Sequence, residues 1–437
     1  MHSSPIVTLK NFNYEKIGII LFFTGIFFLC SSILIGGMFL LPSLLIGSSI
    51  KIKEKNYFND KWNCSLFVCG ILILTNSLLQ FFFIPNNYPV SWDPKLTLIG
   101  IFNWIPLFWI FWACQPYLNS HHKRKTFVIT LIAGTLPLLI TGFGQYFFKW
   151  HGPFKTLNGL IIWYQRPITD GGLSGLFNNQ NYAGTWLNFV WPLSIALILD
   201  KTKNVIKKGI SLSFFISIGV AIFLTYSRNA WTGLFLVIPL VVGGQSFNFL
   251  VPILILFSFI VVLTIFPIFS LEFQSLIKDL IPERILLEFA KEGYENLDVT
   301  RYEIYKSALN MISFKPLIGS GAAAFTAIYY LQTSFYKGHS HNLITELAIS
   351  YGIPVTVILL ITIILLLVLS GRIIFLKNLK IKTTFYERGL WASTFFFFLS
   401  QLVDIQYFDG KISIIAWILI AILKNIIDED NYLRTIN

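Results

Sequence analysis

Charged residues are scarce in this sequence. Asp, Glu, Lys and Arg make up 12% of its 437 residues, whereas hydrophobic residues make up 55%. Because soluble domains carry roughly 25% charged residues, this composition excludes a water-soluble globule with one apolar core. Cysteine is rare as well, and the few cysteines indicate neither a disulfide framework nor a zinc site, since they lie within hydrophobic segments and lack metal-ligand spacing. They are Cys30, Cys64, Cys69 and Cys114.

Long apolar runs recur along almost the whole chain. A bilayer core needs roughly 20 apolar residues per helix, so the sequence predicts an all-α polytopic membrane protein with about 12 transmembrane helices in a single membrane domain, 1–437. The first two helices fit within 17–50 and are predicted to hinge near Gly36 and Gly37. This apolar stretch is too long for a cleavable signal peptide. The other predicted helices are 62–84, 97–118, 126–148, 182–199, 209–226, 230–243, 247–270, 353–371, 389–407 and 412–427.

The net charge of +12 comes from short basic clusters between the apolar runs. This pattern follows the positive-inside rule and does not favour binding to nucleic acid. With twelve helices, every cluster falls on the cytoplasmic side and both termini are cytoplasmic. Merging the first two helices would place all the clusters outside. The preferred topology leaves two large outer loops, 149–181 and 271–342.

Few ionisable residues occur at membrane depth, where they are costly and usually functional. Asp404, near the outer end of the predicted helix 389–407, is the main exception. The two halves of the chain also lack the matching broken helices of many secondary transporters. Both features disfavour transport and direct attention to the outer loops.

Two segments of the second outer loop stand out. Thr300 and Glu303 fit a capping box, which predicts that a helix begins with Arg301 in its first turn; the alternative is a solvated surface arginine. Further on, His339 and His341 directly precede an apolar helical pattern. With no third metal ligand at a fixed spacing, an imidazole here suits a hydrogen-bond acceptor or general base, or else a structural role. The acidic run 428–430 is predicted to be a solvated part of the cytoplasmic tail.

Four motifs in this order resemble the O-antigen ligase and polymerase superfamily of bacterial envelopes. They lie between 175 and 370 and are Gly175–Gly184 (GLFNNQNYAG), Thr225–Gly233 (TYSRNAWTG), Pro316–Gly321 (PLIGSG) and His339–Asn342 (HSHN). The resemblance implies a metal-independent, inverting glycosyltransferase of the bacterial inner membrane, without a cofactor. Its partners would be membrane lipids, a glycan donor linked to undecaprenyl diphosphate, and an acceptor hydroxyl on a glycan, lipid or protein.

The resemblance also implies roles for individual residues. Arg228 and Arg301 stand where the superfamily keeps its diphosphate-binding arginines, and a planar guanidinium suits phosphate oxygens. His341 matches the catalytic loop histidine, which would act as the base. Asn342 is predicted to orient this base, His339 is the weaker candidate for the base itself, and both are predicted to bind the substrate.

The first outer loop supplies three further candidates for substrate binding. Lys155 and Arg166 would extend a cationic rim that receives the carrier, and Asn181 belongs to the motif that begins at Gly175. Gln180 replaces the proline that is commoner in the superfamily, which alters the turn at this point.

Two other functions remain open on sequence grounds. One cyanobacterial branch of the superfamily has been described as a bicarbonate transporter, and a non-catalytic envelope-assembly protein could keep the same fold. The motifs around Arg228, Arg301 and His341 favour the enzyme, because a bicarbonate pathway has no evident need for an outer-face histidine and two distant arginines. A transporter should show anion-dependent uptake that survives His341→Ala.

Overall fold

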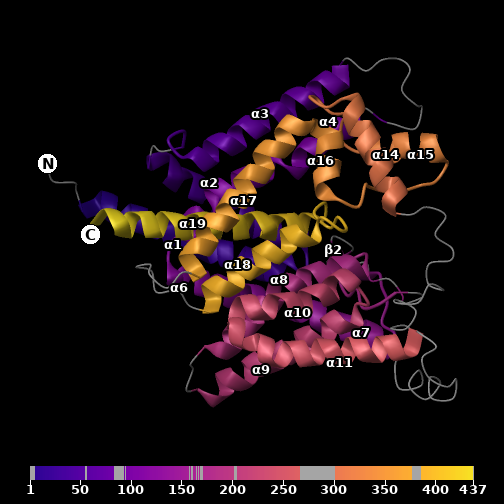
Figure 1. Cartoon of the computed structure of the whole chain (residues 1–437). Helices are drawn as coiled ribbons and strands as arrows, with labels where there is room; N and C mark the ends of the chain where they lie inside the picture. Colours follow the sequence, from indigo (N-terminus) through magenta and orange to yellow (C-terminus); the bar gives the residue numbers. More distant parts are fainter. Residues whose placement is uncertain are drawn as a thin grey trace.

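The computed structural model describes residues 5–54, 57–82, 93, 95–156, 158, 161–163, 165, 167, 171–200, 204–265, 301–375 and 385–436. Within these ranges the chain is largely helical, with one short pair of antiparallel strands (Figure 1). The strands are β1 (Phe154–Thr156) and β2 (Ile161–Trp163). The α-helices are α1 (Pro5–Leu29), α2 (Ile33–Lys53), α3 (Lys61–Phe82), α4 (Lys95–Gly100), α5 (Ile105–Ala113), α6 (His121–Gly134), α7 (Leu136–Phe148), α8 (Gln180–Leu199), α9 (Val205–Leu224), α10 (Arg228–Val242), α11 (Phe247–Ile265), α14 (Arg301–Phe314), α15 (Ala324–Thr333), α16 (Leu343–Tyr351), α17 (Ile353–Phe375), α18 (Phe385–Ser400) and α19 (Gly410–Ile436).

Eight segments of the described chain are long and apolar enough to cross a membrane. They are Ile33–Lys53, Lys61–Phe82, Lys95–Ala113, His121–Phe148, Gln180–Leu199, Val205–Leu224, Ile353–Phe375 and Gly410–Thr435. The prediction of an all-α, multi-pass membrane protein is therefore confirmed. The number of twelve spans, the single domain and the two loop boundaries stay predictions. Both termini lie at one end of the bundle, and α14 and α15 lie at the opposite end (Figure 1).

The predicted hinge between the first two helices is in the wrong place. The chain turns at 30–32, where the Ser32 hydroxyl caps α2, and Gly36 lies inside that helix. A Cβ on Gly36 would come 2.8 Å from Leu29 Cα. The glycine therefore serves close packing of α1 against α2 and not a hinge.

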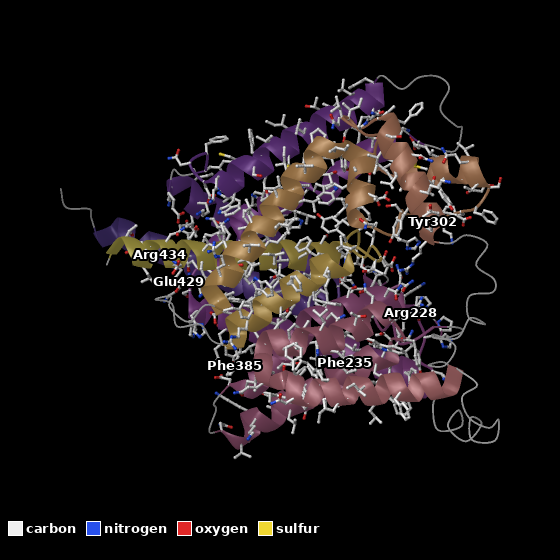
Figure 2. The ribbon with its side chains drawn as sticks, in the orientation of Figure 1. Arg228, Phe235, Tyr302, Phe385, Glu429 and Arg434 are labelled. Atoms are coloured by element: carbon white, nitrogen blue, oxygen red, sulfur yellow. The ribbon has the colours of Figure 1, made fainter. Side chains whose placement is uncertain are left out.

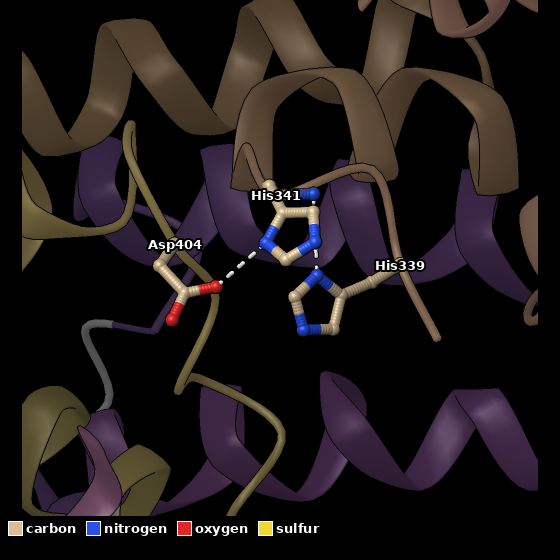
Figure 3. Close-up of side chains that lie close together, drawn as sticks. All are labelled: His339, His341 and Asp404. Carbon is tan, nitrogen blue, oxygen red and sulfur yellow. Dashed lines mark hydrogen bonds and ion pairs between the residues drawn. The ribbon is translucent and has the colours of Figure 1, made fainter. Parts of the chain in front are cut away.

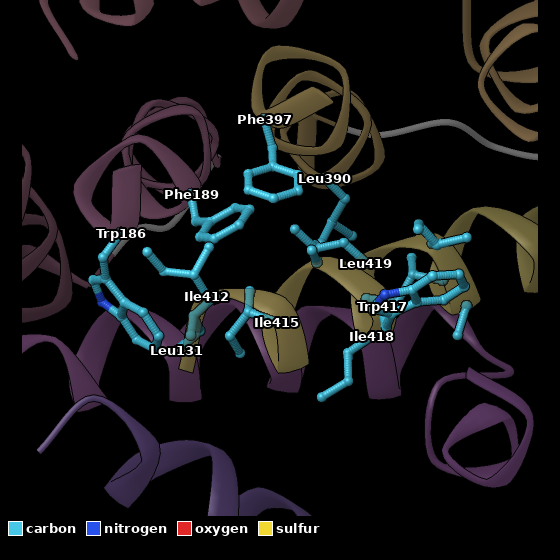
Figure 4. Packing of buried hydrophobic residues seen from close by; sticks show 14 of the residues in the cluster. Leu131, Trp186, Phe189, Leu390, Phe397, Ile412, Ile415, Trp417, Ile418 and Leu419 are labelled. Atoms are coloured by element: carbon cyan, nitrogen blue, oxygen red, sulfur yellow. The ribbon is translucent and has the colours of Figure 1, made fainter. Parts of the chain in front are cut away.

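The core of the bundle surrounds α19 and α8. In their most apolar windows, 83% of α19 and 78% of α8 are buried, against 28% of α2. Figure 4 shows Phe189 of α8 and Phe397 of α18 in contact above α19, with ring centroids 5.0 Å apart. The segment 401–409, which joins α18 to α19, is therefore attached to the buried centre of the bundle.

The acidic run 428–430 is not the solvated tail that the sequence predicts. It lies within α19, and its side chains form ion pairs. Glu429 Oε2 accepts from Arg124 Nη2 at 2.7 Å, and Asp430 Oδ2 from Arg434 Nε at 2.7 Å. Arg124 is almost fully buried, and its Nε also lies 3.3 Å from Glu387 Oε1. This network ties α6, α18 and α19 together near the termini, because a buried charge must be paired.

The two predicted outer loops contain ordered elements. The first holds β1 and β2, and α8 begins at Gln180. In the second, α14 is described from Arg301 onward, and the predicted capping box stays a prediction because Thr300 lies outside the described residues. Residues 266–300 also lie outside them. The loop continues through α15 to the histidine motif, which directly precedes α16.

Candidate functional site

An imidazole and a carboxylate meet in the loops at the end of the bundle opposite the termini. His341 Nδ1 lies 2.9 Å from Asp404 Oδ1, within hydrogen-bond range (Figure 3). The side chains remain 28% and 17% exposed, so the pair is partly desolvated but accessible. His341 has a φ of +57°, a left-handed conformation that is uncommon outside glycine. Such backbone strain persists only where the surroundings impose it, and it is concentrated at functional sites.

Asn342 fixes the loop that carries His341. Its Oδ1 accepts hydrogen bonds from the backbone N–H groups of Ile344 at 2.9 Å and Thr345 at 3.3 Å, which makes it the N-cap of α16. Its Nδ2 donates to the Leu402 carbonyl at 3.0 Å. Both ends of the amide are thus used within the protein. The predicted substrate contact of Asn342 is untested, and the geometry assigns it a structural role.

Besides the bond from Asn342 to Leu402, a backbone hydrogen bond joins the segment that carries His341 to the segment that carries Asp404. Leu343 N donates to the Gln401 carbonyl at 2.9 Å. Behind the loop, the buried Glu346 accepts from the Ser340 backbone N–H at 2.9 Å. These bonds hold the His341 backbone against the segment between α18 and α19, where Asp404 lies.

Two amides hold the second oxygen of Asp404. Its Oδ2 accepts from Gln406 Nε2 at 2.7 Å and from Asn181 Nδ2 at 3.2 Å. Burial opposes ionisation of this carboxyl, but the hydrogen bond with His341 and the nearby imidazoles outweigh it and lower the Asp404 pKa. Asp404 is therefore a carboxylate at neutral pH, and Asn181 joins the site through it.

His339 supports the pair as a neutral ring. Its Nδ1 accepts from the His341 backbone N–H at 3.2 Å, and the two ring centroids are 4.5 Å apart. Burial and the neighbouring His341 lower the pKa of His339 to about 4, against a smaller opposing effect of Asp404. The ring must be unprotonated at Nδ1, because only then can Nδ1 accept the backbone hydrogen bond.

The same three side chains offer metal-ligand atoms within 4.8 Å of one another. The sequence missed this possibility because Asp404, the third ligand, is distant from His339 and His341 along the chain. Here, however, His341 Nδ1 is bonded to Asp404 and His339 Nδ1 to a backbone amide. Each ring has a second nitrogen, Nε2, that could ligate a metal while Nδ1 keeps its hydrogen bond. The geometry fits a metal ion as well as proton transfer, and the metal-independent mechanism stays a prediction.

The hydrogen bond to Asp404 determines which nitrogen of His341 can act. A carboxylate can only accept, so Nδ1 carries the proton and donates it to Asp404 Oδ1. The lone pair then lies on Nε2, where it can take a proton from a hydroxyl. Asp404 would also stabilise the imidazolium that results.

The two predicted arginines begin two helices at the same end of the molecule. Arg228 follows the N-cap Ser227 of α10, and Arg301 is the first residue of α14; both are exposed. Figure 2 shows Arg228 and Tyr302, the neighbour of Arg301, at the end opposite the termini. The N-terminal ends of helices add partial positive charge, which suits an anion.

Apolar packing connects α14, which carries Arg301, with α16, which follows His341. Ile304, Ala308 and Met311 of α14 form one apolar cluster with Phe325 and Tyr329 of α15 and Ile349 of α16. α14 therefore packs in one cluster with α16, which begins two residues after His341.

The structure brings some of the predicted site residues together around His341 and Asp404 and does not connect others with them. It brings His341, His339 and Asn181 together through Asp404. Lys155 is exposed in β1, and Arg166 lies outside the described residues. The sequence already marked Asp404 as an unusual acidic residue near the outer end of a helix, but it could not pair it with His341.

An apolar cavity of about 230 Å³ is lined by residues close in sequence to His341 and Asp404. It lies among α16, α17 and α18, with Trp104, Tyr407 and Trp417 also on its wall. Leu343 and Leu402, each two residues from a member of the pair, line it as well. A chain of hydrocarbon could therefore lie close to the polar site.

A comparison with known protein families gives one match. Residues 212–360, about a third of the chain, match the family model described as O-antigen ligase. The matched region contains Arg228, Arg301 and His341, whereas Asn181 and Asp404 lie outside it. The resemblance to the O-antigen ligase and polymerase superfamily is thereby confirmed, and this supports glycan transfer of the ligase type at the level of the family. No curated protein matches the chain.

Proposed function

We propose that this protein transfers a glycan from an undecaprenyl-diphosphate carrier to an acceptor hydroxyl at the outer face of the bacterial inner membrane. The transfer is inverting and needs no metal, and both termini are cytoplasmic. The observation that carries the proposal is the hydrogen bond between Asp404 and His341, of which His341 lies in the region that matches O-antigen ligase. The hydrogen-bonded pair favours transfer over transport, because a bicarbonate pathway has no evident need for an outer-face histidine.

In the proposed reaction the acceptor oxygen attacks the anomeric carbon from the face opposite the carrier. The new bond joins that carbon to the acceptor, and the bond from the carbon to the diphosphate oxygen breaks. The acceptor proton passes to His341 Nε2. The bonding electrons stay on the diphosphate, whose growing negative charge is met by Arg228 and Arg301. Attack from the opposite face inverts the anomeric centre.

The apolar cavity among α16, α17 and α18 suits the isoprenoid chain of the carrier. Its lining of leucine, isoleucine and aromatic side chains offers contacts to hydrocarbon, with Gln401 as the polar member. A carrier bound there would place its diphosphate near the loops that hold His341. Binding energy from the lipid would then position the sugar for attack.

A strain that lacks the gene tests the function itself. Its lipopolysaccharide should show either loss of the whole ladder on a gel, which indicates ligation, or collapse to single-unit bands, which indicates polymerisation. Plasmid-borne wild-type protein should restore the pattern, and His341→Ala should not. An unchanged ladder, together with unchanged glycosylation of envelope proteins, would contradict the proposal.

Asp404→Asn should lower the rate on the order of 100-fold or more, since general-base catalysis typically contributes roughly 10²–10⁴-fold. The amide no longer stabilises the imidazolium and can hold His341 in the wrong tautomer. Near wild-type transfer by Asp404→Asn would contradict this role of the carboxylate. Asp409→Asn, in the same loop, is the matched control.

The orientation in the membrane can be tested with single cysteines in a background without the four native ones. Ser334 lies exposed at the end of α15, and Thr435 lies exposed near the end of α19. In cells with a permeabilised outer membrane, a membrane-impermeant maleimide should label Ser334→Cys and not Thr435→Cys. Lysis should allow both to react. Labelling of Thr435→Cys and not Ser334→Cys before lysis would overturn the topology.

A further inference from the structure

Two buried glutamines in the segment between α18 and α19 form a hydrogen-bonded network behind Asp404. Gln401 and Gln406 are each 1% exposed. The side-chain Oε1 of Gln401 accepts hydrogen bonds from the backbone N–H groups of Gln406 at 2.9 Å and Tyr407 at 3.0 Å. Its Nε2 donates to Gln406 Oε1 at 3.3 Å and to Ser400 Oγ at 3.0 Å. The segment is thus folded around the side-chain amide of Gln401.

Backbone groups set the direction of the hydrogen bonds in this network. A backbone N–H can only donate, so Oε1 of Gln401 is the acceptor and Nε2 is the donor. Gln406 Oε1 therefore faces Gln401 Nε2, and Thr185 Oγ1 donates to the same oxygen at 3.3 Å. This leaves Gln406 Nε2 to donate to Asp404 Oδ2 at 2.7 Å. Because a carboxylate can only accept, both ends of the Gln406 amide match their partners.

The main chain of Gln401 reaches the segment that carries His341. Its carbonyl accepts from Leu343 N at 2.9 Å, two residues after His341. One residue thus holds the His341 segment through its main chain and the Asp404 segment, by way of Gln406, through its side chain. Both amides are buried from water, so the loss of one donor or acceptor would leave its partner unsatisfied.

The first turns of α8 support the same network from the opposite side. Asn181 and Thr185 lie about one helical turn apart, so they share one face of this helix. Asn181 Nδ2 donates to Asp404 Oδ2 at 3.2 Å, and Thr185 donates to Gln406. α8 is also among the most buried of the candidate spans. Oδ2 of Asp404 is therefore held by two donors, and Oδ1 is left to face His341.

We propose that Gln401 and Gln406 are positioning residues, which hold Asp404 Oδ1 against His341 Nδ1 and so keep the lone pair of His341 on Nε2. The effect on rate rests on the proposed function, whereas the effect on the imidazole does not. Without the bond from Gln406, the Asp404 carboxylate would be free to rotate, and the Nδ1–H tautomer of His341 would lose its acceptor. The Nε2–H tautomer, which has no lone pair on Nε2 for the acceptor hydroxyl, would then gain population.

Gln406→Met tests this role with a side chain of similar length and no hydrogen-bond donor. Gln401 Nε2 keeps its bond to Ser400 Oγ in this variant. We expect kcat for glycan transfer to fall on the order of tenfold with KM unchanged, as is typical for the loss of one hydrogen bond to a charged group. In an Asp404→Asn background the same substitution should cause no further loss, because Gln406 acts through Asp404. Gln115→Met, at a buried glutamine in the turn before α6, should keep normal transfer.

NMR of the imidazole nitrogens gives a readout that does not depend on transfer. The whole protein is reconstituted in bilayers with isotope-labelled histidine at alkaline pH, where imidazoles are neutral. The signal of His341, identified by its loss in His341→Ala, should show a proton on Nδ1 in the wild-type protein. In Gln406→Met it should show a mixture of both tautomers, whereas Gln115→Met should match the wild type.

The two measurements together separate the positioning role from the proposed function. An unchanged tautomer in Gln406→Met, or losses of rate that multiply in the Asp404→Asn background, would overturn the positioning role. A tautomer shift in a protein that transfers no glycan would support the positioning role and overturn the proposed function alone. If Gln406→Met does not fold, Thr185→Val, which has nearly the same shape and removes one donor to Gln406 Oε1, decides by the same two measurements.

Discussion

Replacement of His341 by alanine is expected to reduce glycan transfer on the order of 1,000-fold or more, because the acceptor hydroxyl loses its base. Donor binding should persist, since the diphosphate is held by the arginines and not by the imidazole. Transfer assays and donor-binding measurements on the purified protein would show this separation. Activity of the wild-type protein should also fall at acid pH, because a protonated imidazole cannot accept a proton.

Three further variants define the role of His341. His339→Ala should be milder, since His339 accepts a backbone hydrogen bond and supports the loop without facing the acceptor. His151→Ala, an exposed histidine just after α7, should retain full activity. His341→Gln should be nearly inactive, because an amide forms hydrogen bonds but is not a base at neutral pH. A fully active His341→Gln would mean that the side chain only donates or accepts a hydrogen bond.

Replacement of either Arg228 or Arg301 by alanine should lower the rate by about 100-fold or more, as is typical when a preorganised charge contact in the transition state is lost. The lysine variants should recover part of the activity, since they keep the charge but lose the planar fork that binds two phosphate oxygens. The rate of release of undecaprenyl diphosphate measures the effect directly.

Arg372 provides the matched control for these variants. It is exposed in the last turn of α17, the helix that follows α16, and carries the same side chain away from the proposed diphosphate site. Arg372→Ala should retain normal transfer. If Arg228→Ala and Arg301→Ala are made at normal levels and transfer glycan at near wild-type rates, the two arginines have structural roles only.

Local patterns were sufficient to predict several elements of this structure. The helix Arg301–Phe314 and the long helix near 353–371 follow from apolar spacing and length, which depend on neighbouring residues. The hinge at Gly36 was wrong because a glycine within an apolar run can equally mark a close contact between helices. The acidic run 428–430 was misread in part because Glu429 pairs with Arg124, which is far along the chain. The pairs of Asp428 with Lys424 and of Asp430 with Arg434 are local, at a helical spacing of four residues.

At the candidate site, too, the sequence identified residues in local motifs but could not show contacts between distant segments. His341, Arg228 and Arg301 could be chosen from motifs because each lies within a recognisable local pattern. The pairing of His341 with Asp404 depends on two loops that α16, α18 and α19 bring together, and 63 residues separate the partners. The role of Asn342 as a helix cap likewise follows from its position before α16, but its bond to Leu402 required the folded chain.

The most direct test is transfer by the purified protein in vesicles. A strain that lacks the gene should accumulate both the undecaprenyl-diphosphate-linked glycan and the unmodified acceptor, and extracts of its membranes supply both. Wild-type vesicles are predicted to form the glycosylated product and release one undecaprenyl diphosphate per bond formed, equally well with and without EDTA, and His341→Ala vesicles to form none. Product formation that EDTA abolishes, or that His341→Ala retains, would contradict the metal-free general-base mechanism.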